Sequence, residues 1–390
     1  MKQFPTFTLV VGESSLSRDV LETASRELKL SAPRGGVIRV DDGSTEQVIH
    51  AILALEDHSR RIELVPEGLT LAPLDAEPQT FDSPTEWVIY TSGTSGEPKA
   101  VQHTLESLSR AVRSVDGPRT WGLVYDPHRL AGLAVVLQAL ATESTLVDVR
   151  AGKITEKVDA MREAGVTALS ATPTLWRQML QTGRTSGWAL ERITLGGEVS
   201  DQRTLDALAA EFPQARITHI FAASETGVAF AVGDGREGFP LAYLDSPPRG
   251  VALDIRDDIL WVHSPNSSVA GADGFASTED VVNVTDDRVL FVGRSSGMVN
   301  VGGSKVFPEQ VESLIREHPA IADALVYAKS NPFSGSILLA KVIVLAGAEG
   351  IQAAEIRRWV ASRVPNHMVP AQIEIVDELP RSDNGKVVRS

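Results

Sequence analysis

Cysteine is absent from the 390 residues of the chain. This excludes disulfide scaffolds, thiolate metal sites and a nucleophilic cysteine, so a thiol could enter the chemistry only from a partner molecule. A basic surplus is missing too, because 37 Lys and Arg stand against 51 Asp and Glu, a formal net charge of −14. Since no excess of positive charge is available to neutralise a phosphate backbone, we expect no nucleic-acid partner.

Long uncharged apolar segments are also lacking. No stretch approaches the roughly 18 apolar residues of a membrane helix, and the first thirty residues carry charges throughout, unlike a secretory signal. We therefore expect no membrane span and a cytoplasmic location. At roughly 150 residues per domain, the length predicts two domains, or one large domain with a smaller one.

Short apolar runs alternate with helical patterns over most of the chain, which predicts a layered α/β architecture. Charged turns flank two later runs, at 259–263 and 288–292, and these predict antiparallel strands that end the large domain. The other expected strands are 7–11, 36–40, 87–90, 123–125, 145–149, 168–171, 193–195 and 217–221, and the expected helices include 16–30, 45–56 and 130–141.

The pattern changes near residues 295–297, where a compact α+β unit begins. Its expected elements are a strand at 299–302, a helix from Pro308, strands at 323–327 and 337–345, an amphipathic helix at 351–364 and a strand at 372–376. We therefore predict a boundary that separates a large domain, residues 1–294, from a small domain, residues 295–390.

The strongest local signal is the segment from Tyr90 to Lys99, YTSGTSGEPK, which is dense in glycine and hydroxyl residues. Such a loop can surround phosphate oxygens with backbone N–H and side-chain O–H groups, and its lysine adds charge. It is not a Walker A loop, because Gly96 is followed by Glu-Pro-Lys instead of Lys and a hydroxyl residue. Taken alone, the segment is equally well read as a flexible turn.

Extended by Ala100-Val101, this segment resembles the phosphate-loop signature of the adenylate-forming superfamily, which includes acyl- and aryl-CoA synthetases, peptide-synthetase adenylation domains and luciferases. The chain before the loop is shorter than in typical members, as in compact o-succinylbenzoate-CoA ligase-like forms. Four more motifs follow in the family's order: Gly196-Gly197-Glu198, FAASET at 221–226, Ser277-Thr278-Glu279-Asp280 with Gly293-Arg294, and PRSDNGK at 380–386.

The resemblance implies a large layered α/β domain with a β-rich end, plus a small mobile α+β domain. It implies an ATP-dependent ligase that converts a carboxylic acid to an acyl-adenylate and pyrophosphate. The acyl group would then pass to a phosphopantetheine thiol, either of coenzyme A or of a separate carrier protein. ATP and Mg²⁺ are the expected cofactors. Two alternatives stay open: an amide synthetase with an amine acceptor, and a non-catalytic nucleotide-binding module.

The resemblance also assigns roles to single residues. Lys386, Glu225 and Thr91 would be catalytic; Glu225 would contact Mg²⁺, and Lys386 would stabilise the charge that develops as pyrophosphate departs. Asp280 would accept the ribose hydroxyls beside Arg294. The other residues expected to bind ligands are Ser92, Gly93, Thr94, Ser95, Gly96, Lys99, Gly197, Glu198, Phe221, Ala222, Ser224 and Gly302, of which Phe221 would stack on adenine and Gly302 would line the thiol tunnel.

Three motifs depart from the family pattern. The usual Thr-Gly-Asp reads Thr278-Glu279-Asp280, which keeps the acid but loses the flexible glycine, and the usual Tyr-Gly reads Phe221-Ala222. The family hinge falls on Ser295 and Ser296, where an Asp or Lys is common.

The acyl pocket is less defined by the sequence. Either His128 or Arg129 could take the place of a histidine that many relatives carry beside this pocket. Trp121, Trp176 and Phe230 could wall an aryl pocket, although aromatic residues near apolar runs usually belong to the core. The identity of the acid is not predicted.

Overall fold

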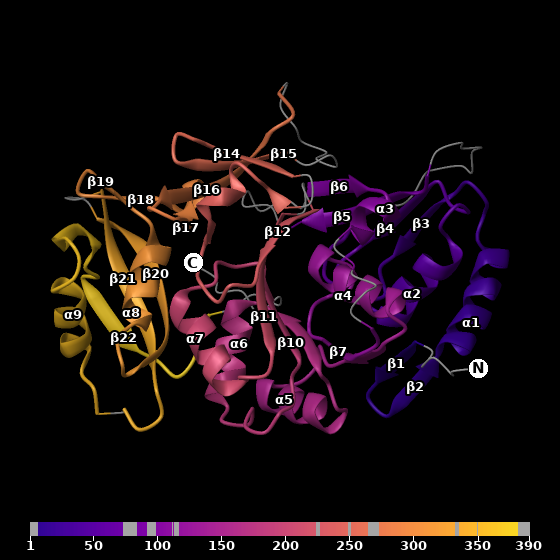
Figure 1. Cartoon of the computed structure of the whole chain (residues 1–390), viewed down its shortest axis with the longest axis horizontal. Coiled ribbons are helices and arrows are strands. Elements are labelled where there is room, and N and C mark those ends of the chain that lie inside the picture. Colours follow the sequence, from indigo (N-terminus) through magenta and orange to yellow (C-terminus); the bar gives the residue numbers. More distant parts are fainter. Residues whose placement is uncertain are drawn as a thin grey trace.

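A computed structural model describes residues 7–72, 84–91, 99–110, 112, 117–223, 227–248, 251–263, 273–331, 335–348 and 350–380. The predicted α/β class is confirmed. Three sheets form a main body, and a smaller unit with two further sheets lies against it (Figure 1).

The largest sheet has the strand order β12-β11-β10-β9-β7-β8-β1-β2. Its six inner strands are parallel, while β12 and β2 pair antiparallel at the two edges. The strands are β1 (Thr8–Val11), β2 (Ser14–Ser17), β7 (Thr120–Leu123), β8 (Thr145–Asp148), β9 (Ala168–Ala171), β10 (Arg192–Gly196), β11 (Arg216–Ala223) and β12 (Gly227–Val232).

Helices cover the two faces of this sheet unequally. Helices α5 (Ile154–Glu163), α6 (Pro173–Gln181) and α7 (Gln202–Glu211) pack on one face, where Leu169, Ile193 and Leu195 join them in an apolar core. On the other face α4 (Leu130–Ala141) packs over Trp121 and Leu123. Polar residues alternate with the apolar ones on β9 and β10, so the face away from α5–α7 carries polar side chains.

A four-stranded sheet, β3-β4-β5-β6, carries the two ends of the predicted phosphate loop. Strands β3 to β5 are parallel and β6 is antiparallel to β5. Its apolar core includes residues of α2, which also contacts α1. The elements are α1 (Arg18–Ser31), β3 (Val37–Val40), α2 (Thr45–Ala54), β4 (Arg61–Leu64), β5 (Glu86–Thr91), β6 (Lys99–His103) and α3 (Leu105–Ser109).

The main body ends in an antiparallel sheet of order β13-β17-β16-β15-β14, which confirms the β-rich end. Its strands are β13 (Phe239–Pro240), β14 (Ala252–Arg256), β15 (Ile259–His263), β16 (Ala276–Val284) and β17 (Arg288–Arg294). A single 3-10 turn, η4 (Ser295–Gly297), follows β17 and leads into the smaller unit. The predicted domain boundary falls at this turn and stays a prediction.

The smaller unit has the strand and helix order that the sequence predicts, with one strand more. Strands β18 and β19 form a hairpin, and β20-β21-β22 form a sheet on which α8 and α9 pack. The elements are β18 (Val299–Val301), β19 (Ser304–Val306), α8 (Pro308–Arg316), β20 (Ile321–Asn331), β21 (Gly335–Val344), α9 (Ala353–Ala361) and β22 (Gln372–Ile375).

Four buried charged residues join the two parts, and we call them the ion-pair cluster: Arg177, Asp201, Arg316 and Asp323. Arg316 of α8 lies 3.0 Å from Asp201, which caps α7, and Arg177 of α6 lies 3.3 Å from Asp323 of β20. None of the four side chains is more than 12% exposed. Burial alone would raise the pKa of Asp201, but the charges of Arg316 and Arg177 lower it below its usual range. Opposite charges therefore fix how α8 sits on α6 and α7.

Among the described residues, no helix combines the length and the apolar character needed to cross a membrane.

Candidate active site

A cleft of about 2440 Å³ opens at the carboxyl ends of β9, β10 and β11. Strands β16 and β17 and helix α8 form its opposite wall. Ligands of α/β proteins bind in this position, because the loops that follow parallel strands meet at one edge of the sheet. Sequence motifs that belong to a ligand-binding site should therefore line this cleft.

The ends of the predicted phosphate loop are held together by β5 and β6. Thr91 is the register partner of Lys99 in this antiparallel pair, and Lys99 is exposed and lines the cleft. The strand pairing thus brings both ends of the loop to one place. Ser92, Gly93, Thr94, Ser95 and Gly96 lie outside the described residues, as do Ser224, Glu225 and Lys386.

Asp280 lines the cleft from β16 and has the environment expected of a ligand-binding carboxylate. Its register partner on β17 is Arg294, whose Nε lies 3.4 Å from Asp280 Oδ1. The Asp280 side chain is 18% exposed, and burial raises the pKa of its carboxyl although the Arg294 charge opposes the shift. Arg294 also donates to the carbonyl oxygen of Thr278 at 3.0 Å. The two motif residues are thus brought together as predicted.

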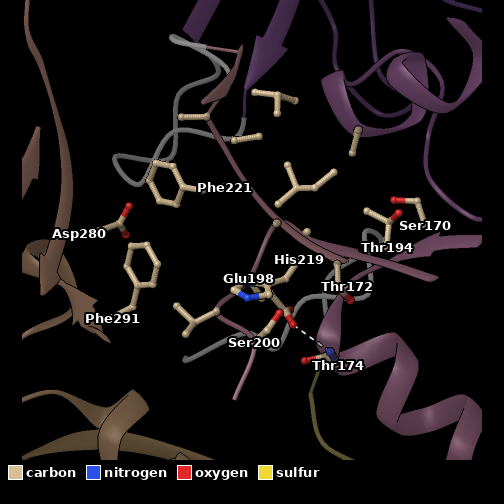
Figure 2. Close-up of a pocket in the computed structure, with 18 of the residues that line it drawn as sticks. Ser170, Thr172, Thr174, Thr194, Glu198, Ser200, His219, Phe221, Asp280 and Phe291 are labelled. Carbon is tan, nitrogen blue, oxygen red and sulfur yellow. Dashed lines mark hydrogen bonds between the residues drawn. The ribbon is translucent and has the colours of Figure 1, made fainter. Parts of the chain in front are cut away.

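Phe221 also lines the cleft, but its ring has aromatic neighbours on both faces. It stacks on Phe230 with centroids 5.2 Å apart and on Phe291 with centroids 5.3 Å apart. Figure 2 shows Asp280 near the rings of Phe221 and Phe291. The predicted stacking of adenine on Phe221 stays a prediction, and Phe291 is an aromatic cleft residue that the sequence reading did not single out.

Gly197, Glu198 and Ala222 line the cleft where β10 and β11 approach it. Gly197 has a φ of +80°, a conformation that glycine adopts without steric cost. Glu198 Oε2 accepts a hydrogen bond from the backbone N–H of Thr174, 3.0 Å away in the first turn of α6 (Figure 2). A helix N-terminus stabilises a carboxylate in this way, so Glu198 is held in place at the cleft wall.

The structure distinguishes His128 from Arg129. His128 is fully buried, contacts the carboxylate of Asp126 through Nδ1 at 3.0 Å, and is not among the cleft residues. Arg129 lines the cleft and its Nε lies 3.6 Å from Asp126 Oδ2. Hydrogen bonds from His128 and the charge of Arg129 lower the pKa of Asp126, although burial alone would raise it. Of the two candidates, Arg129 is therefore the one that lines the cleft.

Gly302 is not among the cleft residues in this arrangement. Gly302 and Gly303 form the two-residue turn of the β18–β19 hairpin, with φ of +59° and +88°, as a tight hairpin turn requires. The hairpin lies on the far side of the smaller unit from β5 and β6 (Figure 1). A role of Gly302 toward a thiol would therefore need a rotation of the smaller unit, and that role stays a prediction.

The sequence reading missed two hydroxyl residues in the cleft, Ser170 and Thr194. It treated β9 and β10 as apolar runs, although the series Ala168-Leu169-Ser170-Ala171-Thr172 and Arg192-Ile193-Thr194-Leu195 alternate in polarity. Such alternation indicates a strand with one buried and one polar face. All three proposed aryl-pocket residues are buried in apolar cores, but Trp121 and Phe230 also line the cleft, while Trp176 does not.

No group of three His, Asp or Glu side chains suited to a metal ion occurs within the described ranges. Mg²⁺ delivered with ATP does not require such a group, because the phosphates and only one or two carboxylates hold the ion. Its predicted protein ligand, Glu225, lies outside those ranges.

Comparison with known proteins identifies the family. The model of the AMP-binding enzyme family matches residues 16–259, and that of the AMP-binding enzyme C-terminal domain matches residues 310–386. The chain belongs to the AMP-binding enzyme family. This confirms the predicted adenylate-forming superfamily and its fold.

Two curated relatives are similar over most of this AMP-binding enzyme. A probable 2-succinylbenzoate–CoA ligase of Mycobacterium tuberculosis is 28% identical over 80% of this chain and 85% of its own length. A 4-chlorobenzoate–CoA ligase of Arthrobacter sp is also 28% identical, over 86% and 71%.

Two solved structures share the fold. ATP-bound MatB from Rhodopseudomonas palustris matches with a TM-score of 0.77 at 16% identity, over 99% of this chain and 95% of that one. The amide bond synthetase McbA from Marinactinospora thermotolerans matches with a TM-score of 0.70 at 18% identity, over 97% and 94%.

The family and the CoA-ligase relatives confirm the predicted enzyme class, an AMP-forming acid–thiol ligase that uses ATP and Mg²⁺. They also support a small carboxylic acid and a phosphopantetheine thiol as its substrates. The absence of a nucleic-acid partner and the cytoplasmic location stay predictions.

Proposed function

We propose that this ligase builds its acyl-adenylate in the cleft between β9–β11 and β16–β17, and that coenzyme A is the thiol that receives the acyl group. The observation that supports the site is the pair of the largely buried Asp280 and the half-exposed Arg294, which lies beside the aromatic rings of Phe221 and Phe291. A carboxylate in this position can accept both ribose hydroxyls, and the rings offer apolar surface to a base.

In the first step a carboxylate oxygen of the acid attacks the α-phosphorus of ATP. The new bond joins this oxygen to phosphorus, and the bond from phosphorus to pyrophosphate breaks. Mg²⁺ bound with ATP neutralises phosphate charge. We propose that Lys99 and the loop from Thr91 bind the phosphates, and that Lys386 stabilises the charge as it spreads over the reacting groups.

In the second step the thiol sulfur attacks the acyl carbon, a carbon–sulfur bond forms, and the bond to AMP breaks. The thiol proton leaves to solvent or to the departing phosphate. We propose that residues 295–390 form the mobile unit that serves both steps, with Gly302 near the thiol in the second. The names of the two CoA-ligase relatives support coenzyme A over a carrier protein as acceptor.

Acid-dependent exchange of pyrophosphate into ATP tests the first step. We expect Lys386→Ala to lower the exchange rate by about 100-fold or more and Asp280→Asn to raise the KM for ATP. Lys329→Ala removes an exposed lysine of β20 outside the cleft and should leave both unchanged. Equal exchange in the wild type and Lys386→Ala would remove the role of that lysine.

The second step is tested by adding coenzyme A, a phosphopantetheinylated carrier protein or an amine to the acyl-adenylate. Thioester formation with coenzyme A supports the proposal. Amide formation without thioester would instead identify an amide synthetase, the alternative that the sequence leaves open.

A further inference from the structure

The polar face of the largest sheet forms an ordered floor to the cleft. Register aligns Trp121 with Ala168 on β9, and Ala168 with Arg192 on β10. Two residues further along the strands, Ser170 aligns with Thr194. Alternate residues share a face of a strand, so Trp121, Ser170, Thr194 and Arg192 all face away from α5–α7. All four line the cleft.

This floor begins at the carboxyl ends of the strands, where the carboxyl of the acid would react. From there it runs back along the strands toward their amino ends, a direction that we call inward. With a rise of about 3.3 Å per residue, Ser170 lies about 7 Å inward from Thr172, and Trp121 about 13 Å inward from Tyr125. Tyr125 at the outer end is close to Ser170 and Glu198, and burial raises the pKa of its phenol, so Tyr125 stays a neutral hydroxyl. Figure 2 shows Ser170 and Thr194 next to each other on the side of the cleft opposite Asp280.

Trp121 provides the observation that points to a ligand. Trp121 lines the cleft although the residue is only 5% exposed. Within the described part of the chain, nothing accepts a hydrogen bond from its indole N–H. A buried donor without an acceptor destabilises the protein. An acceptor that arrives with a bound molecule would recover this energy. The hydroxyl of Thr194 adds a potential donor on the same face. The Ser170 hydroxyl is hydrogen-bonded to the phenol of Tyr125, and it can accept the phenol proton while it donates its own proton to a ligand.

We propose that the acid activated by this enzyme carries a hydrogen-bond acceptor, a carbonyl or carboxylate oxygen, at the end remote from its reacting carboxyl. Ser170, Thr194 and Trp121 bind this acceptor and so determine which acids are used. The inference rests on the proposed function, since it places the acid on the sheet face that leads inward from the adenylate. An acid with a purely apolar end would leave the Trp121 indole N–H without a partner, and sites built to hydrogen-bond a substrate discriminate strongly against such analogues.

Matched pairs of acids test this inference. The members of each pair have similar size and differ in the remote acceptor: 4-acetylbenzoate against 4-isopropylbenzoate, and 7-oxooctanoate against 7-methyloctanoate. The readout is kcat/KM for acid-dependent pyrophosphate exchange. We expect the wild type to favour the acceptor-bearing member of at least one pair by about tenfold, the effect of one hydrogen bond of about 1.4 kcal/mol.

Two variants connect this selectivity to the named donors. Thr194→Val replaces a hydroxyl by a methyl group of similar size, and Trp121→Phe removes the indole N–H but keeps an aromatic ring. Each should reduce the selectivity several-fold and leave the KM for ATP unchanged. Thr120→Val is the matched control, because Thr120 precedes Trp121 on β7 and its side chain faces the opposite side of the sheet.

Equal kcat/KM for both members of both pairs in the wild type would overturn the inference, as would full selectivity in both variants. Absence of exchange with every acid would contradict the proposed function instead. Calorimetric binding of the same acid pairs to the AMP-bound enzyme would then decide separately whether the acceptor is recognised.

Discussion

Glu279 shows at the scale of one residue how a family motif can be kept at a conformational cost. It stands where relatives have the glycine of Thr-Gly-Asp, and its φ of +61° is the left-handed conformation that glycine tolerates best. Side chains with a Cβ pay about 1–2 kcal/mol there. The neighbouring Asp280 is nevertheless paired with Arg294, so the chain keeps the carboxylate of the motif and accepts local strain.

We predict that Glu279→Gly raises the free energy of unfolding by about 0.5–1 kcal/mol, because relief of strain exceeds the added flexibility of the unfolded chain. Denaturant unfolding measures the change. Glu279→Ala is the control, since alanine also removes the carboxylate but keeps the Cβ. A gain of equal size in both variants would mean that charge and not backbone strain is responsible.

At the scale of elements, the fixed position of α4 depends on a close backbone approach. A Cβ built on Gly132, in the first turn of α4, would lie only 2.1 Å from the carbonyl oxygen of Asp126. The same turn begins after Arg129, the cleft residue paired with Asp126. A glycine at position 132 therefore sets where the helix begins and how Arg129 enters the cleft.

We predict that Gly132→Ala destabilises the protein by about 2 kcal/mol or more, because the helix must shift to admit the methyl group. It should also raise the KM for the acid more than the KM for ATP, since α4 borders the acyl side of the cleft. Thermal unfolding and exchange kinetics measure these effects. Gly350→Ala, at a position with open space around it, should change neither; a comparable loss there would argue against the steric explanation.

Most elements were predictable because each carries its own pattern. Apolar runs located β9, β10, β11 and β17, a proline-initiated helical pattern located α8, and the family motifs located Asp280 and Arg294. The cleft elements β16, α6 and α7 were not predicted. Strand β7 begins earlier than predicted, at Thr120 instead of Leu123, because its pairing with β8 and β9 decides its limits. Ser14–Ser17 was missed because a short polar edge strand has almost no periodic signal.

At the scale of the whole molecule, the ion-pair cluster could not be predicted. Its residues come from α6, the start of α7, α8 and β20, and no sequence spacing connects them. Phe291 was missed for the same reason, since only folding brings β17 next to β11. Sequence identifies single charged or aromatic residues, but their partners across the chain follow from tertiary packing.

We predict that Arg316→Met loosens the smaller unit, because Asp201 and Asp323 both lose the cation of α8 that pairs with them across the contact. The chain lacks cysteine, so fluorophores can be attached at Glu163→Cys and Glu355→Cys, on exposed positions of α5 and α9. The distribution of energy transfer between them should broaden, and adenylation should slow several-fold. Arg358→Met, an exposed change on α9, is the control; an unaltered distribution in Arg316→Met would show that other contacts hold the unit.

The stack of Phe221, Phe230 and Phe291 limits where a movement of the smaller unit can begin. It ties β17 to β11 and β12 through ring contacts, and Phe291 lies only three residues before Arg294, the last residue of β17. The end of the main body is thereby anchored almost up to the 3-10 turn at Ser295–Gly297. A rotation of residues 295–390 would have to pivot beyond this anchor, so that the nucleotide contacts proposed for Asp280 would persist while the opposite wall of the site changes.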